Sequence, residues 1–287
     1  MSPATLAGLG AIALWTTLAL LTRAASGIPP LQLTAMTFAV SGTLGLIWLA
    51  AAGRLDALWQ KPIAWVHGVG GLFGYHVLFF VAFALAPAVE VNLLNYLWPL
   101  LVVLFSGLLL GLRLTWRHAA GTALALAGCV LLVGQDAAFR GDALAGYAAA
   151  VGCAVVWGLY SVLARRMAAV PTGAVAGFCI ATALLATLAH LAAERSVMPD
   201  PRALLAALAL GAGPAGASFF LWDIGMKRGD PRLLGTLAYA IPVVSTLLLV
   251  AAGEAALTTR VVLAALLVAA GGMIAARASA STADGTA

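Results

Sequence analysis

The stretch Asn95-Tyr96-Leu97-Trp98-Pro99 lies inside an apolar run and has a counterpart 143 residues later, Ala238-Tyr239-Ala240-Ile241-Pro242. Tyrosine falls on tyrosine and proline on proline, and each stretch continues into a further apolar run. A proline inside a helix removes a backbone hydrogen bond. Its recurrence at one offset, beside the same aromatic residue, indicates a duplicated unit rather than chance similarity between apolar segments.

The same offset, give or take one residue, runs through the rest of the chain: Trp15 falls on Trp157 and Pro29 on Pro171. Each half contains five apolar runs long enough to cross a hydrocarbon core about 30 Å thick. Because five is odd, the second half must enter the membrane from the opposite side, which makes an inverted repeat. The ten predicted spans are 4–24, 31–52, 63–85, 88–110, 117–134, 143–164, 173–193, 203–226, 233–252 and 260–277.

The composition excludes a soluble or disordered protein. Of the 287 residues, 63% are apolar and only 9% are charged, against about 25% charged in soluble domains. A net charge of +5 could suggest nucleic acid, but the basic residues stand singly or in pairs at the ends of apolar runs, as membrane topology signals do. We therefore predict an all-α integral membrane protein that contacts the lipid bilayer and no nucleic acid.

Lysine and arginine also predict the orientation. If the N-terminus is cytoplasmic, ten of the 15 basic residues face the cytoplasm and five face the other side. This bias predicts that both termini are cytoplasmic. We expect a first five-helix repeat over residues 1–138, a second over 139–278, and a disordered cytoplasmic tail over 279–287.

At this point the chain resembles the drug/metabolite transporter superfamily, in its ten-helix EamA-type branch with two repeated halves. The resemblance is carried by Tyr96-Leu97-Trp98-Pro99 and Leu237-Ala238-Tyr239-Ala240-Ile241-Pro242, and by Gly253-Glu254 after the second motif. The first half has Gly111-Leu112-Arg113 where the family often has Gly-Glu. Within the superfamily the chain is most similar to bacterial exporters of amino acids, including aromatic ones. The resemblance implies a multi-pass protein of a bacterial inner membrane.

One face of the fourth predicted helix is polar. Asn92, Asn95, Tyr96 and Pro99 stand at i, i+3, i+4 and i+7, which places them on one side of a helix. Pro99 leaves the carbonyl group of Asn95 without its usual partner. Two interpretations stay open: the face lines a cavity near the middle of the membrane, or it forms a hydrogen-bonded seam between helices without a ligand.

Aromatic residues near helix centres are the second indication of a site. Tryptophan and tyrosine in membrane proteins usually gather at the interfaces, so central ones are candidates to line a cavity. An aromatic substrate would stack on such rings, and an ammonium group could lie against their faces. The predicted substrate-binding residues are Trp15, Tyr75, His76, Asn92, Asn95, Tyr96, Trp98, Trp157, Tyr160 and Tyr239, and the predicted hinges are Pro99 and Pro242.

Few other residues of the sequence suggest an ion pair, a metal site or a catalytic site. Asp223 and Lys227 are four residues apart, a spacing that predicts an ion pair on one helix. The four histidines have no metal-binding spacing, and no phosphate-binding loop motif occurs. We therefore expect no metal, no cofactor and no enzymatic activity.

The sequence favours a transporter of small amphipathic molecules. The predicted aromatic pocket suits aromatic or other apolar amino acids as its substrates. It would act as an exporter by alternating access around a midplane cavity. The alternatives are a broad-specificity exporter of drug or nucleoside type and, more remotely, a non-transporting membrane scaffold. The sequence does not distinguish a monomer from a dimer, or a proton-coupled carrier from an uncoupled one.

Overall fold

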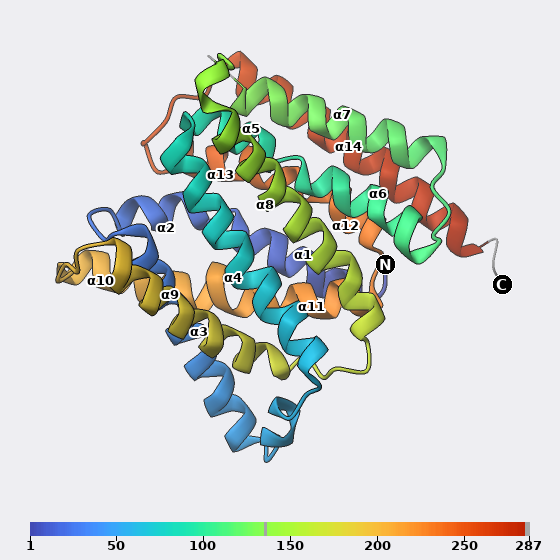
Figure 1. Ribbon diagram of the computed structural model, residues 1–287. Helices are drawn as coiled ribbons and strands as arrows, with labels where there is room; N and C mark the ends of the chain where they lie inside the picture. The colour runs from blue at the N-terminus through green and yellow to red at the C-terminus, as the bar shows by residue number, and fades with distance from the viewer. Residues whose placement is uncertain (135–136, 285–287) are drawn as a thin grey trace.

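The computed structural model describes residues 1–134 and 137–284, and this part of the chain is built from helices without a strand (Figure 1). The α-helices are α1 (Pro3–Trp15), α2 (Leu18–Ala24), α3 (Pro30–Ala51), α4 (Pro62–Leu85), α5 (Ala88–Asn95), α6 (Trp98–Leu110), α7 (Trp116–Val133), α8 (Leu144–Leu163), α9 (Ala174–Ala193), α10 (Pro201–Ala212), α11 (Ser218–Arg228), α12 (Pro231–Leu237), α13 (Ala240–Ala251) and α14 (Thr259–Asp284). Short 3₁₀ turns are η1 (Leu55–Leu58), η2 (Gly141–Ala143) and η3 (Ala164–Met167), and η4 (Gly213–Ala217) is a π-helical segment.

Within the described residues these helices make ten spans that are long and apolar enough to cross a membrane, which confirms the predicted number. Six spans are single α-helices with short extensions, and four are interrupted near the middle. In chain order, spans 1 to 10 are α1 with α2, α3, α4, α5 with α6, α7, α8, α9, α10 with α11, α12 with α13, and α14.

The last helix differs from the expectation at the C-terminus. α14 continues to Asp284, so residues 279–284, which we expected in a disordered tail, are helical. Alanine is the best helix former, and the apolar face of α14 packs against α7 over its earlier turns. Residues 285–287 lie outside the described residues.

Several helices begin where the sequence supplies a cap. Asp200 accepts hydrogen bonds from the first backbone amides of α10, and Asp230 does the same for α12. In both helices a proline follows directly, at the first helical position, where its missing amide hydrogen costs nothing. The Asp-Pro pairs that mark breaks in the sequence are therefore helix starts.

The two halves interlock instead of packing as separate domains. The most extensive contacts between helices join one half to the other: α1 packs on α11, α4 on α8, α3 on α9 and α7 on α14. Under the repeat, the pair of spans 1 and 8 corresponds to the pair of spans 6 and 3, so the contacts follow the duplication. The boundary expected near residue 138 therefore divides the sequence repeat but not the hydrophobic core.

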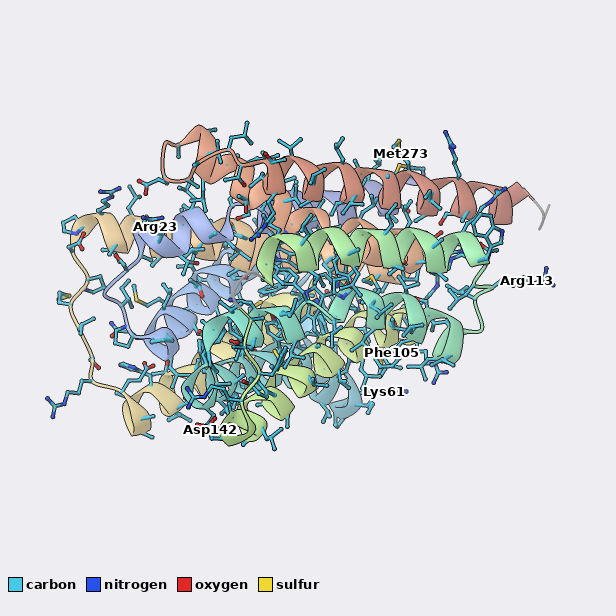
Figure 2. The ribbon with its side chains drawn as sticks, turned by 90° about the horizontal axis from the view of Figure 1, so that it is seen from above. Arg23, Lys61, Phe105, Arg113, Asp142 and Met273 are labelled. Carbon is cyan, nitrogen blue, oxygen red and sulfur yellow. The ribbon has the colours of Figure 1, made fainter. Side chains whose placement is uncertain are left out.

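The N-terminus and the C-terminal end of α14 lie at one end of the bundle (Figure 1). We call it the termini end; it also holds the α6–α7 connection with Arg113, as Figures 1 and 2 show. Arg23 and Asp142 lie at the opposite end, the far end (Figure 2). Four of the basic residues that we assigned to one face of the membrane by counting spans, Arg113, Arg165, Arg228 and Arg232, line one hollow with Met1 at this end.

The closest contact between two long helices joins α7 and α14, which run side by side in Figure 1. A Cβ atom added at Gly121 would lie 2.7 Å from the carbonyl oxygen of Gly271, and one added at Gly271 would lie 2.8 Å from the backbone nitrogen of Ala125. The helices meet backbone to backbone, and small residues permit this approach in a membrane. The two glycines come from corresponding spans of the two halves.

Replacement of Gly271 by valine should therefore destabilise the bundle, because the added side chain meets backbone that cannot move aside. Overpacking of this kind costs about 1–3 kcal/mol. The measurement is thermal unfolding of purified protein in detergent. The matched control is Gly70→Val in α4, where a Cβ would have nothing within 4 Å. Equal stability of the two variants would contradict the close α7–α14 contact.

Candidate functional site

Span 1 is interrupted at Thr16 and Thr17, between α1 and α2. The hydroxyl of Thr16 donates to the carbonyl of Ala13 and that of Thr17 to the carbonyl of Leu14, both at 2.7 Å. The backbone amide of Thr17 also bonds to Leu14, three residues back. Threonine side chains that bond to the preceding turn bend helices. The change of direction falls one residue after Trp15.

Spans 4 and 9 are interrupted at the two predicted hinges. α5 ends at Asn95, and α6 begins at Trp98 with Pro99 in its first turn. In span 9, Pro242 has no amide hydrogen for the carbonyl of Ala238, and this carbonyl instead accepts from the amide of Ile241 at 3.0 Å. Both breaks therefore lie just before the duplicated prolines, as their chemistry requires.

Span 8 carries an interruption that the sequence reasoning missed. The π-helical segment Gly213–Ala217 joins α10 to α11, and Ala215 within it has non-helical backbone angles, φ −109° and ψ 18°. The run Gly211-Ala212-Gly213-Pro214-Ala215-Gly216 is the available signal. Hydrophobic segments broken by glycine and proline are typical of binding sites in transporters with inverted repeats.

These four interruptions surround a cavity of about 220 Å³ in the middle of the bundle, which we call the central cavity. Its walls come from spans 1, 3, 4, 6, 8 and 9. It is lined by Trp15, Leu18, Tyr75, His76, Phe79, Asn92, Asn95, Tyr96, Trp98, Trp157, Pro214, Ala215, Phe219 and Ile241.

Tryptophans form the floor of the central cavity. The ring of Trp15 lies 6.1 Å from that of Trp98 and 5.8 Å from that of Trp157, in both cases edge to face. The three side chains are only 5–6% exposed. Trp222 lies behind them, with its ring 5.0 Å from Trp15 and its indole N–H donating to Ser161. Edge-to-face pairs contribute about 0.5–1.5 kcal/mol each beyond burial, so this tryptophan cluster is a rigid base.

Polar groups are confined to one wall. The amide nitrogen of Asn95 donates to the hydroxyl of Tyr75 at 3.1 Å, while its side-chain oxygen has no hydrogen-bond partner although it is buried. His76 holds the carbonyl of Leu72 through Nδ1 at 2.7 Å; since a carbonyl only accepts, Nδ1 carries the hydrogen and Nε2 is an acceptor. A buried acceptor without a partner costs about 1–3 kcal/mol, so the oxygen of Asn95 is a place for a donor from a ligand.

The central cavity is sealed on the side of the termini end. A Cβ atom at Gly235 in α12 would lie 2.9 Å from the carbonyl oxygen of Pro99, and one at Gly225 in α11 would lie 2.7 Å from the Cα atom of Gly8. These helices touch backbone to backbone below the tryptophan cluster. The repeat counterpart of Gly235 is Asn92, which stays partly exposed and lines the cavity. The cavity is therefore closed towards the termini end and reaches towards the far end.

Eight of the ten predicted site residues line the central cavity; Tyr160 and Tyr239 do not. Tyr160 lies behind Trp157, with its ring 5.0 Å from that of His67 and nearly parallel to it. Tyr239 is fully buried among residues of α7 and α14, including Cys129. Helical periodicity places Tyr239 and its counterpart Tyr96 alike, but Tyr239 is packed against α7 and α14, whereas Tyr96 lines the central cavity.

Further lining residues were not predicted: Leu18, Phe79, Pro214, Ala215, Phe219 and Ile241. Most are apolar, and an apolar residue at the middle of a span carries no sequence signal that separates a cavity wall from a lipid-facing or packed surface. Only the broken run around Pro214 could have been recognised.

The predicted pair on span 8 is confirmed. Lys227 and Asp223 are 2.8 Å apart and both are buried. Thr172 donates to the same carboxylate oxygen at 2.6 Å, and Lys227 also donates to the carbonyl of Val170. The pair fastens α11 to the α8–α9 connection near the termini end, outside the central cavity. Among the residues that the structure describes, no three His, Cys, Asp or Glu side chains gather as metal ligands do.

Comparison with known proteins agrees with this geometry. The chain is 54% identical to the aromatic amino acid exporter YddG of Ancylobacter novellus over 253 residues, 87% of this chain and 88% of the relative. It is 28% identical to YddG of Salmonella typhimurium, covering 85% of this chain and 87% of that protein. A solved crystal structure with 52% identity superposes with a TM-score of 0.92 over 95% of this chain and 96% of the other.

The family model described as the EamA-like transporter family matches twice, over residues 2–134 and 144–277. The two matches coincide with the two five-span halves and confirm the repeat. The spans and the bacterial relatives make this a multi-pass protein of the bacterial inner membrane. By this duplicated match over nearly its whole length, the chain belongs to the EamA-like transporter family.

Proposed function

We propose that this protein exports aromatic amino acids, which bind in the central cavity while the two halves rock around them. The observation that carries the proposal is the combination of a tryptophan floor with a buried, unpartnered side-chain oxygen at Asn95. Relatives that cover most of this chain are named aromatic amino acid exporters, which supports the same substrate class.

Each part of an aromatic amino acid meets matching chemistry in the central cavity. The substrate ring would pack edge to face on Trp15, Trp98 or Trp157. The ammonium group would donate to the oxygen of Asn95. The hydroxyl of Tyr75 accepts from Asn95, so its own hydrogen is available to the substrate carboxylate. Binding would thus pair the one buried acceptor that the described protein leaves open in this wall.

The asymmetric seal supports alternating access. Gly235 contacts the backbone at Pro99, whereas Asn92, the repeat counterpart of Gly235, lines the open cavity. In an inverted repeat the two ends can exchange these roles. The excess of basic residues at the termini end supports a cytoplasmic location for it, so the structure would represent the conformation open to the outside.

Replacement of Trp157 by alanine should impair transport, because it removes a ring from the cavity floor. Loss of one well-formed aromatic contact with burial, about 1.4 kcal/mol, corresponds to roughly a tenfold fall in transport at low substrate concentration. The measurement is counterflow of labelled L-tryptophan or L-phenylalanine in proteoliposomes of the purified protein. The matched control is Trp59→Ala, since Trp59 is 87% exposed at the termini end.

The outcome for the unmodified protein separates the candidate substrates. Counterflow of aromatic amino acids supports the proposal. If hydrophobic cations or nucleosides exchange and aromatic amino acids do not, the broad-specificity alternative replaces it. Intact counterflow in Trp157→Ala would remove the central cavity as the binding site.

Replacement of Pro99 or Pro242 by alanine should slow transport while leaving substrate binding largely intact. Alanine restores an amide hydrogen, and one added backbone hydrogen bond of about 0.5–1.5 kcal/mol would slow bending by roughly two- to tenfold. Maximal counterflow rate reports bending, and quenching of tryptophan fluorescence by substrate reports binding. Pro62→Ala is the control, because Pro62 begins α4, where no bond is missing. Unchanged rates in both variants would show that the two breaks do not move.

A further inference from the structure

A second hollow, of about 700 Å³, opens at the termini end of the bundle. Spans 1, 6, 8, 9 and 10 and the α6–α7 connection contribute residues to it, and spans 1, 6, 8 and 9 also form walls of the central cavity. The seal at Gly225 and Gly235 lies between the two spaces. We call this hollow the vestibule; its charged lining consists of Arg113, Arg165, Arg228, Arg232 and Asp230.

Three of these charged side chains already bind other groups of the protein. Arg232 holds the carboxylate of Asp230 through two side-chain nitrogens and donates to the carbonyl of Arg113 at 2.8 Å. Burial would raise the pKa of Asp230, which lies in the connection between spans, but hydrogen bonds from Arg232 and Ser279 outweigh this and lower its pKa. Asp230 therefore stays ionised and is neutralised by Arg232. Arg165 donates to the carbonyl of Gly229 at 2.8 Å.

The side chains of Arg113 and Arg228 differ from these three. Both are exposed on the vestibule, and within the described part of the chain neither side chain makes a hydrogen bond or an ion pair. The orientation of the protein in the membrane does not require these two arginines to line the vestibule, because Arg54 and Arg117 supply positive charge at the same end without lining it. The vestibule therefore presents two guanidinium groups that can bind a ligand, on the side of the Gly225 and Gly235 seal that faces the termini end.

We propose that the vestibule is an entrance site that attracts the carboxylate of the amino acid from the cytoplasm before the seal opens. This inference rests on the proposed function and adds a second site to it. A guanidinium group binds carboxylates through paired hydrogen bonds, and this short-range contact selects the carboxylate end of an amino acid, which is a zwitterion without net charge. The substrate ring stays free to enter the central cavity next.

The experiment is transport into inside-out membrane vesicles, where the termini end faces the bath. The double variant Arg113→Gln/Arg228→Gln should raise the KM for L-tryptophan about three- to tenfold, as expected for the loss of exposed ion-pair contacts with the carboxylate, with the maximal rate unchanged. The rise should shrink near 1 M salt, which screens exposed ion pairs. In right-side-out vesicles, which present the far end, the KM of the variant should equal that of the unmodified protein.

The matched control is Arg54→Gln/Arg117→Gln, which removes the same charge from the same end outside the vestibule. An equal rise in KM in this control would overturn the proposal in favour of general surface charge. An unchanged KM in the vestibule variant would overturn it directly, while transport by the unmodified protein would leave the proposed function standing.

Anionic phospholipid headgroups offer the same oxyanion chemistry, so a lipid arm distinguishes the sources. The KM difference should persist in proteoliposomes made only of phosphatidylcholine. A difference that appears only when phosphatidylglycerol is added would assign the vestibule to a lipid phosphate and overturn the proposal. Because Arg113 and Arg228 have no internal side-chain partners among the described residues, the variant should fold, and its thermal unfolding in detergent checks this.

Discussion

The bilayer core supplies no water to satisfy backbone polar groups, and the rest of the structure depends on this constraint. Irregular backbone is tolerated at membrane depth only where it is buried in protein or lines a cavity. Four spans are interrupted among the described residues, and all four interruptions border the central cavity. Threonine hydroxyls, a tightened turn before each duplicated proline and a π-helical segment take up the displaced hydrogen bonds. The candidate site therefore lies where the helices break.

The sequence predicts the ten spans and the duplication well, because hydropathy over some 20 residues is a strong signal in a chain that must meet lipid. It predicts the site in part. Asn92, Asn95 and Tyr96 were found because polar groups at mid-depth need a reason to be there. Tyr239 carries the same pattern but is packed against α7 and α14, because a repeat seen in one conformation has one half closed. Apolar walls such as Phe219 and Ile241 carry no such signal, since lipid, core and cavity all accept them.

The two halves are alike in sequence, but they pack differently at the two ends of the central cavity. The contact of Gly235 with the backbone at Pro99 is tight because glycine has no side chain to hold the helices apart. At the far end the same place in the repeat holds Asn92, whose amide faces the cavity. The sealed end thus has glycine at this place in the repeat, and the open end has asparagine, a polar residue that lines the central cavity.

The interlocked packing of the halves has a consequence for synthesis. Gly42, Gly68 and Gly71 in spans 2 and 3 are in van der Waals contact with Ile180, Phe178 and Tyr160, all supplied by the second half. At a ribosomal speed of about 5–20 residues per second, the first five spans wait roughly 7–30 s for their partners. During that time the helix surfaces at these three glycines contact lipid acyl chains instead of the second half. The nascent protein is therefore most vulnerable to membrane proteases, and most dependent on insertion chaperones, before its second half emerges.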